Sequence, residues 1–271
     1  MILTVTHRTL YRYDAPVRGV VQSHRLTPAA FEGQQPRDWQ VTVSGSVIGG
    51  GFRDGAGDWV QAHTVQGPVS EIEVLVEGVI ETVDTAGVLR GHKEVVAPPV
   101  YLRKTAPTRP DGALRALAQK AVAGAEDPLD QAHRLMAGVA DAIAYRPGQT
   151  DAGTTAAEAL ALGAGVCQDH AHALIACACS LGLPARYVSG YLMVGEGDGP
   201  NEAAHAWAEI WIEGLSAWVG FDAANRCCPN AQYIRLGSGF DAQDAAPIRG
   251  TARGTGEENL DVTVAIAAVQ Q

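Results

Sequence analysis

Three residues with complementary chemistry follow one another in the second half of the chain: Cys167, His205 and Asp222. A thiol needs a neighbouring base to hold it as a thiolate, and the base needs a partner that fixes its tautomer. A carboxylate that accepts the Nδ1–H of the histidine ring is such a partner. Each residue taken singly has a simpler interpretation, because free cysteines and single strand histidines usually pack in the interior. Together they predict a nucleophile, a general base and an orienting carboxylate.

The sequence around Cys167 places its thiol at the start of a helix. Gly163 and Gly165 break the chain just before the cysteine, and an apolar helical run continues to about Leu181. A helix N-terminus carries unpaired N–H groups and about half a unit of positive charge, and both favour thiolate over thiol. We therefore expect Cys167 to be primed as a nucleophile.

The other two residues lie on predicted strands, 205–212 and 218–222. In the first strand, aliphatic residues alternate with a side that begins at His205 and Trp207. If the aliphatic sides of both strands share the core, His205 and Asp222 emerge on the same face of the sheet. Rigid strands hold such a geometry better than loops do.

The residues before the predicted triad divide into a strand-rich and a helix-rich part. The first hundred residues alternate apolar and polar positions at a period of two, which predicts strands at 2–13, 39–47, 59–65 and 72–83. Four prolines between Ala97 and Gly112 exclude a central strand or a helix interior there. We therefore place a boundary near residue 98. The predicted fold class is α+β, with an antiparallel β-domain over 1–97 and a catalytic domain over 98–271.

Beyond the boundary the apolar period becomes helical. It predicts helices over 113–123 and 129–143, and a short helix from Thr155 to about Leu162 with the spacing of a capping box. Further strands are predicted at 186–194 and 260–269, and Gly195 to Pro200 predicts a loop. The predicted short helix ends just before the segment that contains Cys167.

Composition excludes several classes of partner. The net charge of −10 argues against nucleic acid, which needs a concentrated basic surface. The chain has no run of about 18 apolar residues that could cross a membrane, and its first 13 residues lack the apolar core of a signal peptide. Five clustered cysteines suggest no disulfide framework. We expect a cytoplasmic protein with neither nucleic acid nor membrane as partner, and its oligomeric state stays open.

Four blocks of sequence resemble the core motifs of bacterial transglutaminase-like proteins of the papain-like superfamily. In the order of that family, they are 165–172, 186–191, 205–209 and 219–225. Residues 11–28 and the strands after them resemble the family's β-rich N-terminal domain, and residues 241–250 resemble its C-terminal signature. The resemblance implies helices packed on an antiparallel sheet. It also implies Cys167 as nucleophile, His205 as base and Asp222 as orienting carboxylate.

The chain departs from the family pattern at two places. His170 stands where the family often has an aromatic residue, which adds a titratable group one helical turn from Cys167. The C-terminal signature is altered around Phe240 to Ala246. The second departure concerns the lining of the site and not the triad.

The chemistry that these residues predict is acyl transfer to a thiol. The thiolate attacks a peptide or carboxamide carbonyl, His205 protonates the departing amine, and a thioester remains. The main-chain N–H of Cys167 would hold the oxyanion with a second donor, for which Gln168 and Trp207 are candidates, and His170 is a candidate for the lining of the site. The expected partner is a peptide or protein substrate, and no cofactor or metal is required.

The acyl acceptor decides the type of enzyme. Water makes it a protease or amidase, and a lysine-like amine makes it a transglutaminase. The resemblance covers both, and we favour hydrolysis because no feature of the sequence indicates a tunnel that excludes water.

Two other interpretations compete with an acyl-transfer enzyme. A metal site could combine Cys167, His170 and His172 with His205 and the Cys227–Cys228 pair, but residue 172 turns away from the helix face that 167 and 170 share. A peptide-binding module without catalysis would be marked by loss of a triad residue, and all three are present.

Overall fold

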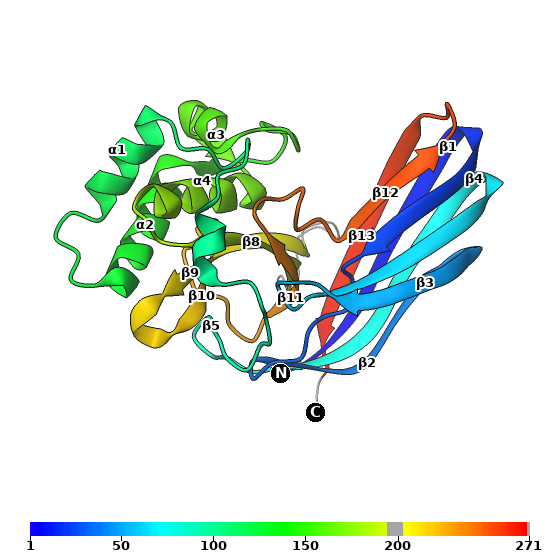
Figure 1. Ribbon diagram of the computed structural model, residues 1–271, viewed down its shortest axis with the longest axis horizontal. Coiled ribbons are helices and arrows are strands. Elements are labelled where there is room, and N and C mark those ends of the chain that lie inside the picture. The colour runs from blue at the N-terminus through cyan, green and yellow to red at the C-terminus, as the bar shows by residue number, and fades with distance from the viewer. Residues whose placement is uncertain (194–202, 270–271) are drawn as a thin grey trace.

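The computed structural model describes residues 1–193 and 203–269, which form two antiparallel sheets and a group of helices. Figure 1 shows one sheet of long strands on the right, with the helices and the shorter sheet on the left. The predicted α+β class is confirmed. The predicted loop over 195–200 and the end of the strand predicted at 186–194 lie outside the described residues. No helix in the described ranges is long and apolar enough to cross a membrane.

The first sheet is built on two long strands, β1 (Ile2–His24) and β4 (Trp59–Thr82), which pair along most of their lengths. β2 (Gln34–Val43) and β3 (Ser46–Arg53) both pair with β4. The strand predicted at 39–47 is wrong in extent, because a turn at Ser44 and Gly45 divides it. Gly45 has a φ of 64°, a conformation that glycine adopts without steric cost.

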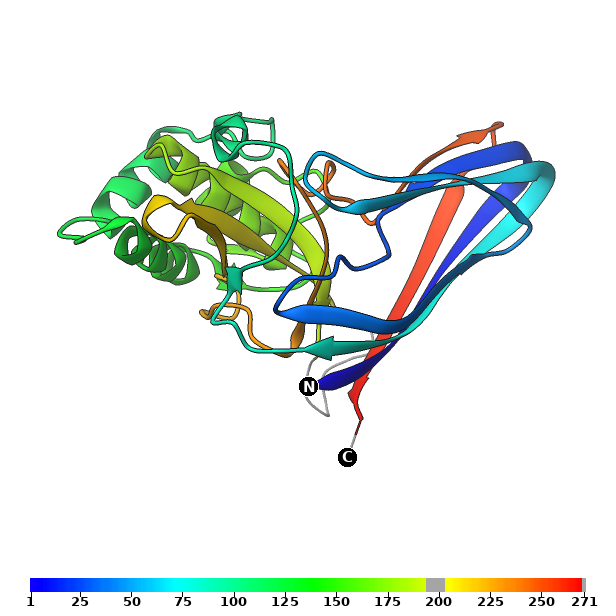
Figure 2. The same ribbon diagram turned by 60° about the horizontal axis from the view of Figure 1, so that its bottom comes forward.

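The last two strands, β12 (Ile248–Arg253) and β13 (Glu258–Ala268), pair with β1 on the edge opposite β4. The C-terminal end of the chain therefore lies in the first sheet, although the sequence prediction assigned 98–271 to one catalytic domain. Pairing between residues that lie over two hundred positions apart leaves no local signal in the sequence. Figure 2 shows these strands running beside β1, close to the N-terminal end of the chain.

The second sheet positions the candidate site. Its strands run in the order β11 (Tyr233–Gly239), β8 (Ala185–Leu192), β9 (Ala204–Ile212), β10 (Ala217–Phe221) and β5 (Val88–Leu89). β5 comes from before the predicted boundary and extends this sheet by pairing with β10. β5, β11 and β12 were not predicted, and the first has only two residues.

Four helices cover one face of the second sheet: α1 (Gly112–Ala121), α2 (Pro128–Ala142), α3 (Ala156–Leu162) and α4 (Cys167–Ser180). α4 packs on β8 and β9 and is surrounded by the other three helices (Figure 1). Residues 169–179 of α4 are all buried, as expected for a helix that is apolar on every side. The predicted helices are confirmed to within about two residues at each end.

The helix ends follow the capping chemistry of the sequence. Thr155 and Glu158 form the predicted capping box of α3, with the Thr155 N–H donating to Glu158 Oε2 at 2.9 Å. Short segments complete the fold: η1 (Pro98–Leu102), η2 (Glu213–Leu215), and the parallel pair β6 (Ala144–Tyr145) and β7 (Ala164–Gly165). β7 ends two residues before Cys167 and aligns the chain for the start of α4.

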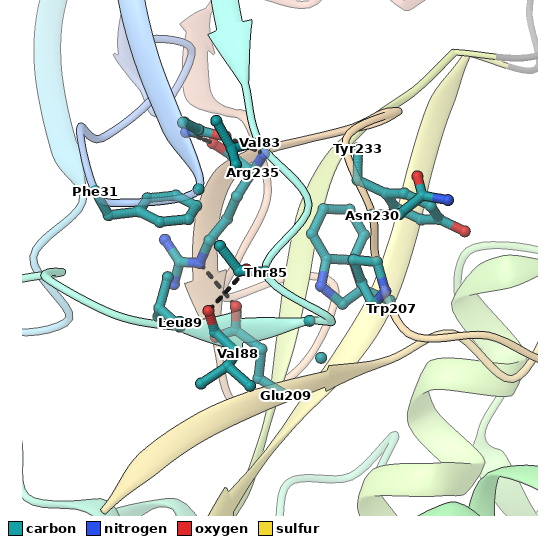
Figure 3. Close-up of a pocket in the computed structure, with 15 residues that line it drawn as sticks. Phe31, Val83, Thr85, Val88, Leu89, Trp207, Glu209, Asn230, Tyr233 and Arg235 are labelled. Carbon is teal, nitrogen blue, oxygen red and sulfur yellow. Dashed lines mark hydrogen bonds and ion pairs between the residues drawn. The ribbon is translucent and has the colours of Figure 1, made fainter. Parts of the chain in front are cut away.

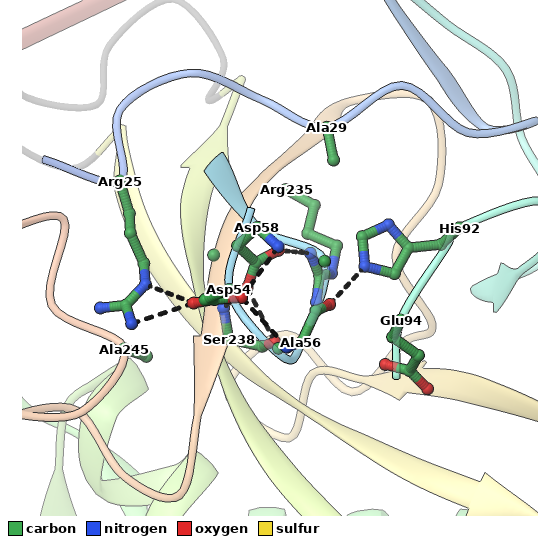
Figure 4. Close-up of polar contacts among 12 residues, drawn as sticks. Arg25, Ala29, Asp54, Ala56, Asp58, His92, Glu94, Arg235, Ser238 and Ala245 are labelled. Carbon is green, nitrogen blue, oxygen red and sulfur yellow. Dashed lines mark hydrogen bonds and ion pairs between the residues drawn. The ribbon is translucent and has the colours of Figure 1, made fainter. Parts of the chain in front are cut away.

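A chain of buried charges joins the two sheets. Arg235 of β11 pairs with Asp58 at 2.6 Å and with Glu209 at 3.0 Å, and Arg186 pairs with Glu209 at 2.7 Å and with Glu94 at 2.5 Å. Figure 4 shows Asp58, from the turn between β3 and β4, pointing to Arg235 and Ser238. Arg186 and Glu209 lie in the family-like blocks of sequence, and the structure gives both a role in this interface.

Candidate active site

Cys167 is the first residue of α4, and its side chain is half-buried. Asp169 fixes this helix start, because its Oδ2 accepts hydrogen bonds from the Val166 N–H at 2.8 Å and from the Thr150 hydroxyl at 2.7 Å. Gly165 leaves room for that carboxylate, since a Cβ at position 165 would lie 2.6 Å from the Asp169 Cβ. The local sequence thus presents the thiol at the positive end of a helix.

His205 joins Cys167 to Asp222. Its Nε2 lies 2.7 Å from Asp222 Oδ2, and the Cys167 side chain lies near enough to the ring to raise its pKa. Antiparallel pairing of β9 with β10 sets this arrangement, because Phe221 lies opposite Ala208 and Asp222 follows at the end of β10. The structure therefore brings together the three residues that the sequence predicted as a triad.

The nitrogen that meets the carboxylate differs from the prediction. The sequence predicts that Nδ1–H meets Asp222, whereas the structure places Nε2 there. Asp222 lies at the end of the ring that is farther from the backbone, so it meets the distal nitrogen. The order of the strands could not reveal which end of the ring faces the carboxylate.

Asp222 is held by five hydrogen-bond donors. Oδ2 accepts from His205 Nε2, from Asn225 Nδ2 at 2.7 Å and from the Tyr233 hydroxyl at 2.8 Å. Oδ1 accepts from the main-chain N–H groups of Ala224 and Asn225, at 3.0 and 3.2 Å. Tyr233 was missed by the sequence analysis, since it follows Asp222 by 11 residues on a strand that the sequence pattern did not predict.

The charges of the site reinforce one another. Burial lowers the pKa of His205. The interactions with Asp222 and Cys167 outweigh burial and raise the pKa to about 9. Burial raises the pKa of Asp222, and hydrogen bonds from His205, Asn225 and Tyr233 outweigh it, so the pKa lies below its usual value. Both effects favour an imidazolium beside the Asp222 carboxylate at neutral pH.

Trp207 and Gln168, the candidates for the second oxyanion donor, have other partners in the structure. Trp207 is buried between two glycines, where a Cβ at Gly190 would lie 2.7 Å from the indole. Trp207 and Tyr233 lie on one wall of a cavity of about 40 Å³ between the sheets (Figure 3). Gln168 Nε2 donates to the Ala152 carbonyl at 3.3 Å. The main-chain N–H of Cys167 therefore stays the predicted oxyanion donor.

His170 and His172 both point into packed surroundings. The two ring nitrogens of His170 lie 2.9 Å from the carbonyl oxygens of Val166 and Ile143, and His172 Nε2 accepts from the Ala242 N–H at 3.0 Å. Burial lowers the pKa of His172 to about 4. Within residues 1–193 and 203–269, no three His, Cys, Asp or Glu side chains converge as a metal site.

The remaining four cysteines differ from Cys167 in their surroundings. Burial raises the pKa of Cys177 to about 12, and that of Cys179 and Cys228 to about 11. It also raises the pKa of Cys227, whose Sγ lies 3.3 Å from the Tyr233 hydroxyl. A raised pKa leaves little thiolate at neutral pH, so these thiols are poor nucleophiles.

Comparison with known proteins agrees with the site and the fold. Residues 115–223 match the model of the transglutaminase-like superfamily, and residues 3–81 match that of the bacterial transglutaminase-like N-terminal region. The chain is thus similar to transglutaminase-like proteins over both of these regions. The first matched region covers α2 to α4 and β8 to β10, and the second covers most of β1 to β4.

Individual relatives extend the family match. The uncharacterized protein ML0607 of Mycobacterium leprae is 29% identical over 97% of this chain and 98% of its own length. The uncharacterized protein Rv2569c of Mycobacterium tuberculosis is 38% identical over 46% of this chain and 42% of its own length. A solved structure described as "a Putative Cysteine Protease" from Cytophaga hutchinsonii has a TM-score of 0.75 at 21% identity, covering 100% of this chain and 92% of that one. This last likeness shows the fold.

Proposed function

We propose that this transglutaminase-like protein hydrolyses peptide or carboxamide substrates through a thioester on Cys167. The observation that carries the proposal is the His205 ring, which interacts both with Cys167 at the start of α4 and with Asp222. This is the arrangement that acyl transfer to a thiol requires. The partner is accordingly a peptide or protein substrate.

The reaction proceeds in two halves. The Cys167 thiolate attacks the carbonyl carbon, and the charge that develops on the oxygen faces the main-chain N–H of Cys167. The intermediate collapses as the C–N bond breaks and the His205 imidazolium gives its proton to the departing amine. A water molecule then attacks the thioester, His205 takes its proton, and the Cys167 thiolate leaves as a carboxylic acid forms.

The packing of Trp207 favours water as the acceptor. An amine competes with water only where the thioester is shielded, and an aromatic roof over the thiol is one way to shield it. Trp207, the aromatic residue nearest in sequence to His205, is buried between Gly190 and Gly220, so its ring is engaged in packing within the sheet. The Cys167 side chain is itself half-buried, so solvent reaches it.

The test measures both possible products in one reaction. A mixture of carboxamide peptides is incubated with the protein and an excess of a primary amine, and mass spectrometry quantifies acid and amine-conjugated products. Cys167→Ala is the inactive control, and Cys228→Ala is a matched control for loss of a half-buried thiol outside the triad. We expect mainly acid from the wild type and from Cys228→Ala.

Two outcomes would contradict the proposal. A predominance of amine conjugates would reassign the protein as a transglutaminase. A protein that binds the peptides but forms neither product, and that captures no electrophilic peptide on Cys167, would be a binding module.

A further inference from the structure

Tyr233 contacts the predicted catalytic carboxylate from a strand that carries no member of the triad. Its hydroxyl donates to Asp222 Oδ2 at 2.8 Å, beside the bond from His205 Nε2 to the same oxygen. The Tyr233 ring is buried and packs edge-on against Trp207, with ring centroids 5.5 Å apart. Figure 3 shows the two rings side by side. The phenol is therefore held in one place by packing.

Residues of the first sheet and of its β3–β4 turn form hydrogen bonds with the chain on both sides of Tyr233. The side-chain amide of Gln34 in β2 donates to the Arg235 carbonyl at 2.8 Å and accepts from the Arg235 N–H at 2.9 Å, as a neighbouring strand would. The Thr82 hydroxyl of β4 donates to the Ala231 carbonyl at 2.5 Å. Asp58 fixes the far end of β11, where its Oδ2 accepts from the Ser238 N–H at 2.6 Å (Figure 4). The position of Tyr233 thus depends on residues of the first sheet.

We propose that Tyr233 is a positioning residue that holds the Asp222 carboxylate toward His205, and that the first sheet keeps Tyr233 in register through β11. The inference rests on the proposed triad chemistry. It assigns the N-terminal region a task in the reaction, because the region supplies the outer support of the catalytic carboxylate.

Tyr233 affects both the charge and the orientation of the Asp222 carboxylate. Its carboxylate is buried, and each donor that faces Oδ2 both stabilises the negative charge and restricts rotation of the group. The titratable groups that face Asp222 are His205 from β9, Tyr233 from β11 and Cys227 across the isolated bridge. Loss of the phenol hydroxyl leaves the anion less stabilised, so the carboxylate takes up a proton at higher pH.

The first experiment compares Tyr233→Phe with Tyr191→Phe. Tyr191 is the matched control, because it is another buried tyrosine of the same sheet, and its hydroxyl bonds at 2.7 Å to His7 Nδ1 and not to a member of the triad. The readout is the rate of Cys167 alkylation by iodoacetamide between pH 4 and pH 10 in each protein.

For Tyr233→Phe we expect a rate about tenfold lower at neutral pH, the scale of one hydrogen bond to a charged group. We also expect the acid limb of the profile to move to higher pH, while Tyr191→Phe follows the wild type. A purely structural role would lower the melting temperature without moving the acid limb. Superimposed profiles of Tyr233→Phe and wild type would overturn the proposal.

The second experiment tests the support from the first sheet. Thr82→Val removes the hydroxyl bond to Ala231, and Gln34→Ala removes both bonds to Arg235 together with one to the Ala29 carbonyl. Gln35→Ala is the control, because the Gln35 side-chain amide donates to the Phe31 carbonyl and not to β11. We expect Thr82→Val and Gln34→Ala to move the acid limb in the direction of Tyr233→Phe. Neither should add to the shift when combined with Tyr233→Phe. Fully additive shifts, or profiles equal to that of Gln35→Ala, would contradict the support by β11.

A third measurement separates this inference from the proposed function. The proton between His205 Nε2 and Asp222 gives a low-field NMR signal whether or not the protein turns over a substrate. If Tyr233 positions Asp222, Tyr233→Phe loses this signal at a higher pH than wild type does. A wild type without reactive Cys167 would refute the proposed function, whereas an unchanged NMR signal in Tyr233→Phe would refute the positioning role.

Discussion

His205 Nε2 lies 2.7 Å from Asp222 Oδ2, and the Cys167 side chain interacts with the same ring. The imidazole therefore bridges a helix start and the end of a strand that lie 55 residues apart in the chain, as 222 − 167 shows. This contact makes the three side chains one chemical unit, and changes to any one of them should affect the same step.

Cys167→Ala should abolish thioester formation while leaving the fold intact. The thiol lies half-buried at the first position of α4, so its removal opens little buried volume. Turnover and the melting temperature check both parts, with Cys228→Ala as the control that keeps full activity. Hydrolysis by Cys167→Ala at the wild-type rate would show that another residue is the nucleophile.

Asp222→Asn should reduce turnover by orders of magnitude. An amide in place of the carboxylate would present an N–H to one of the donors that now face Oδ2, and it removes the charge that balances the imidazolium. Because Asp222 is buried with five donors, we also expect a loss of stability of about 1–3 kcal/mol. Urea denaturation and turnover are measured together. Wild-type turnover in Asp222→Asn would assign the orienting role to Asn225.

The unfolding free energy should depend on pH through the protonation of His205. Its pKa in the folded protein, about 9, lies above the ordinary value of 6.5. A raised pKa contributes stability that is fully present below about pH 6.5 and is lost as the pH rises through about 9. The difference in unfolding free energy between wild type and His205→Ala should therefore shrink from pH 6 to pH 10. A constant difference across this range would mean that the folded protein does not hold the imidazolium.

Much of the site could be predicted from the sequence because its signals are local. The glycines before Cys167 and the apolar run after it define a helix start, and the alternation around His205 and Asp222 defines two adjacent strands. Adjacent antiparallel strands bring their facing ends together without further information. The capping box at Thr155 was predictable for the same reason.

What the sequence could not predict depends on contacts between distant residues. Tyr233 reaches Asp222 only because β11 pairs with β8 on the far side of the sheet from β10. β12 and β13 join β1 across almost the whole chain. The sequence offers Trp207 as a candidate oxyanion donor, and it does not reveal that the glycines at 190 and 220 make room for its indole inside the sheet.

Removal of one partner from the buried charges between the sheets should be strongly destabilising. Glu209→Ala would leave Arg186 and Arg235 buried with one carboxylate partner fewer each, which typically costs about 3–5 kcal/mol. Glu213→Ala is the control, since Glu213 is exposed and bonds to the Trp211 indole at the surface. Urea denaturation should show a large loss for the first variant and almost none for the second. Equal losses would mean that the buried chain contributes no more than a surface contact.

We propose that His205 and Asp222 hold Cys167 as a thiolate. Cys167 should then react with an alkylating reagent faster than the other four free cysteines do. The protein is treated with a small amount of iodoacetamide at pH 7, and mass spectrometry locates the label in wild type and His205→Ala. We expect Cys167 to be labelled faster than the other cysteines in the wild type, and no faster than they are in His205→Ala. Preferential labelling of Cys227 or Cys228, or a rate at Cys167 that His205→Ala leaves unchanged, would contradict it.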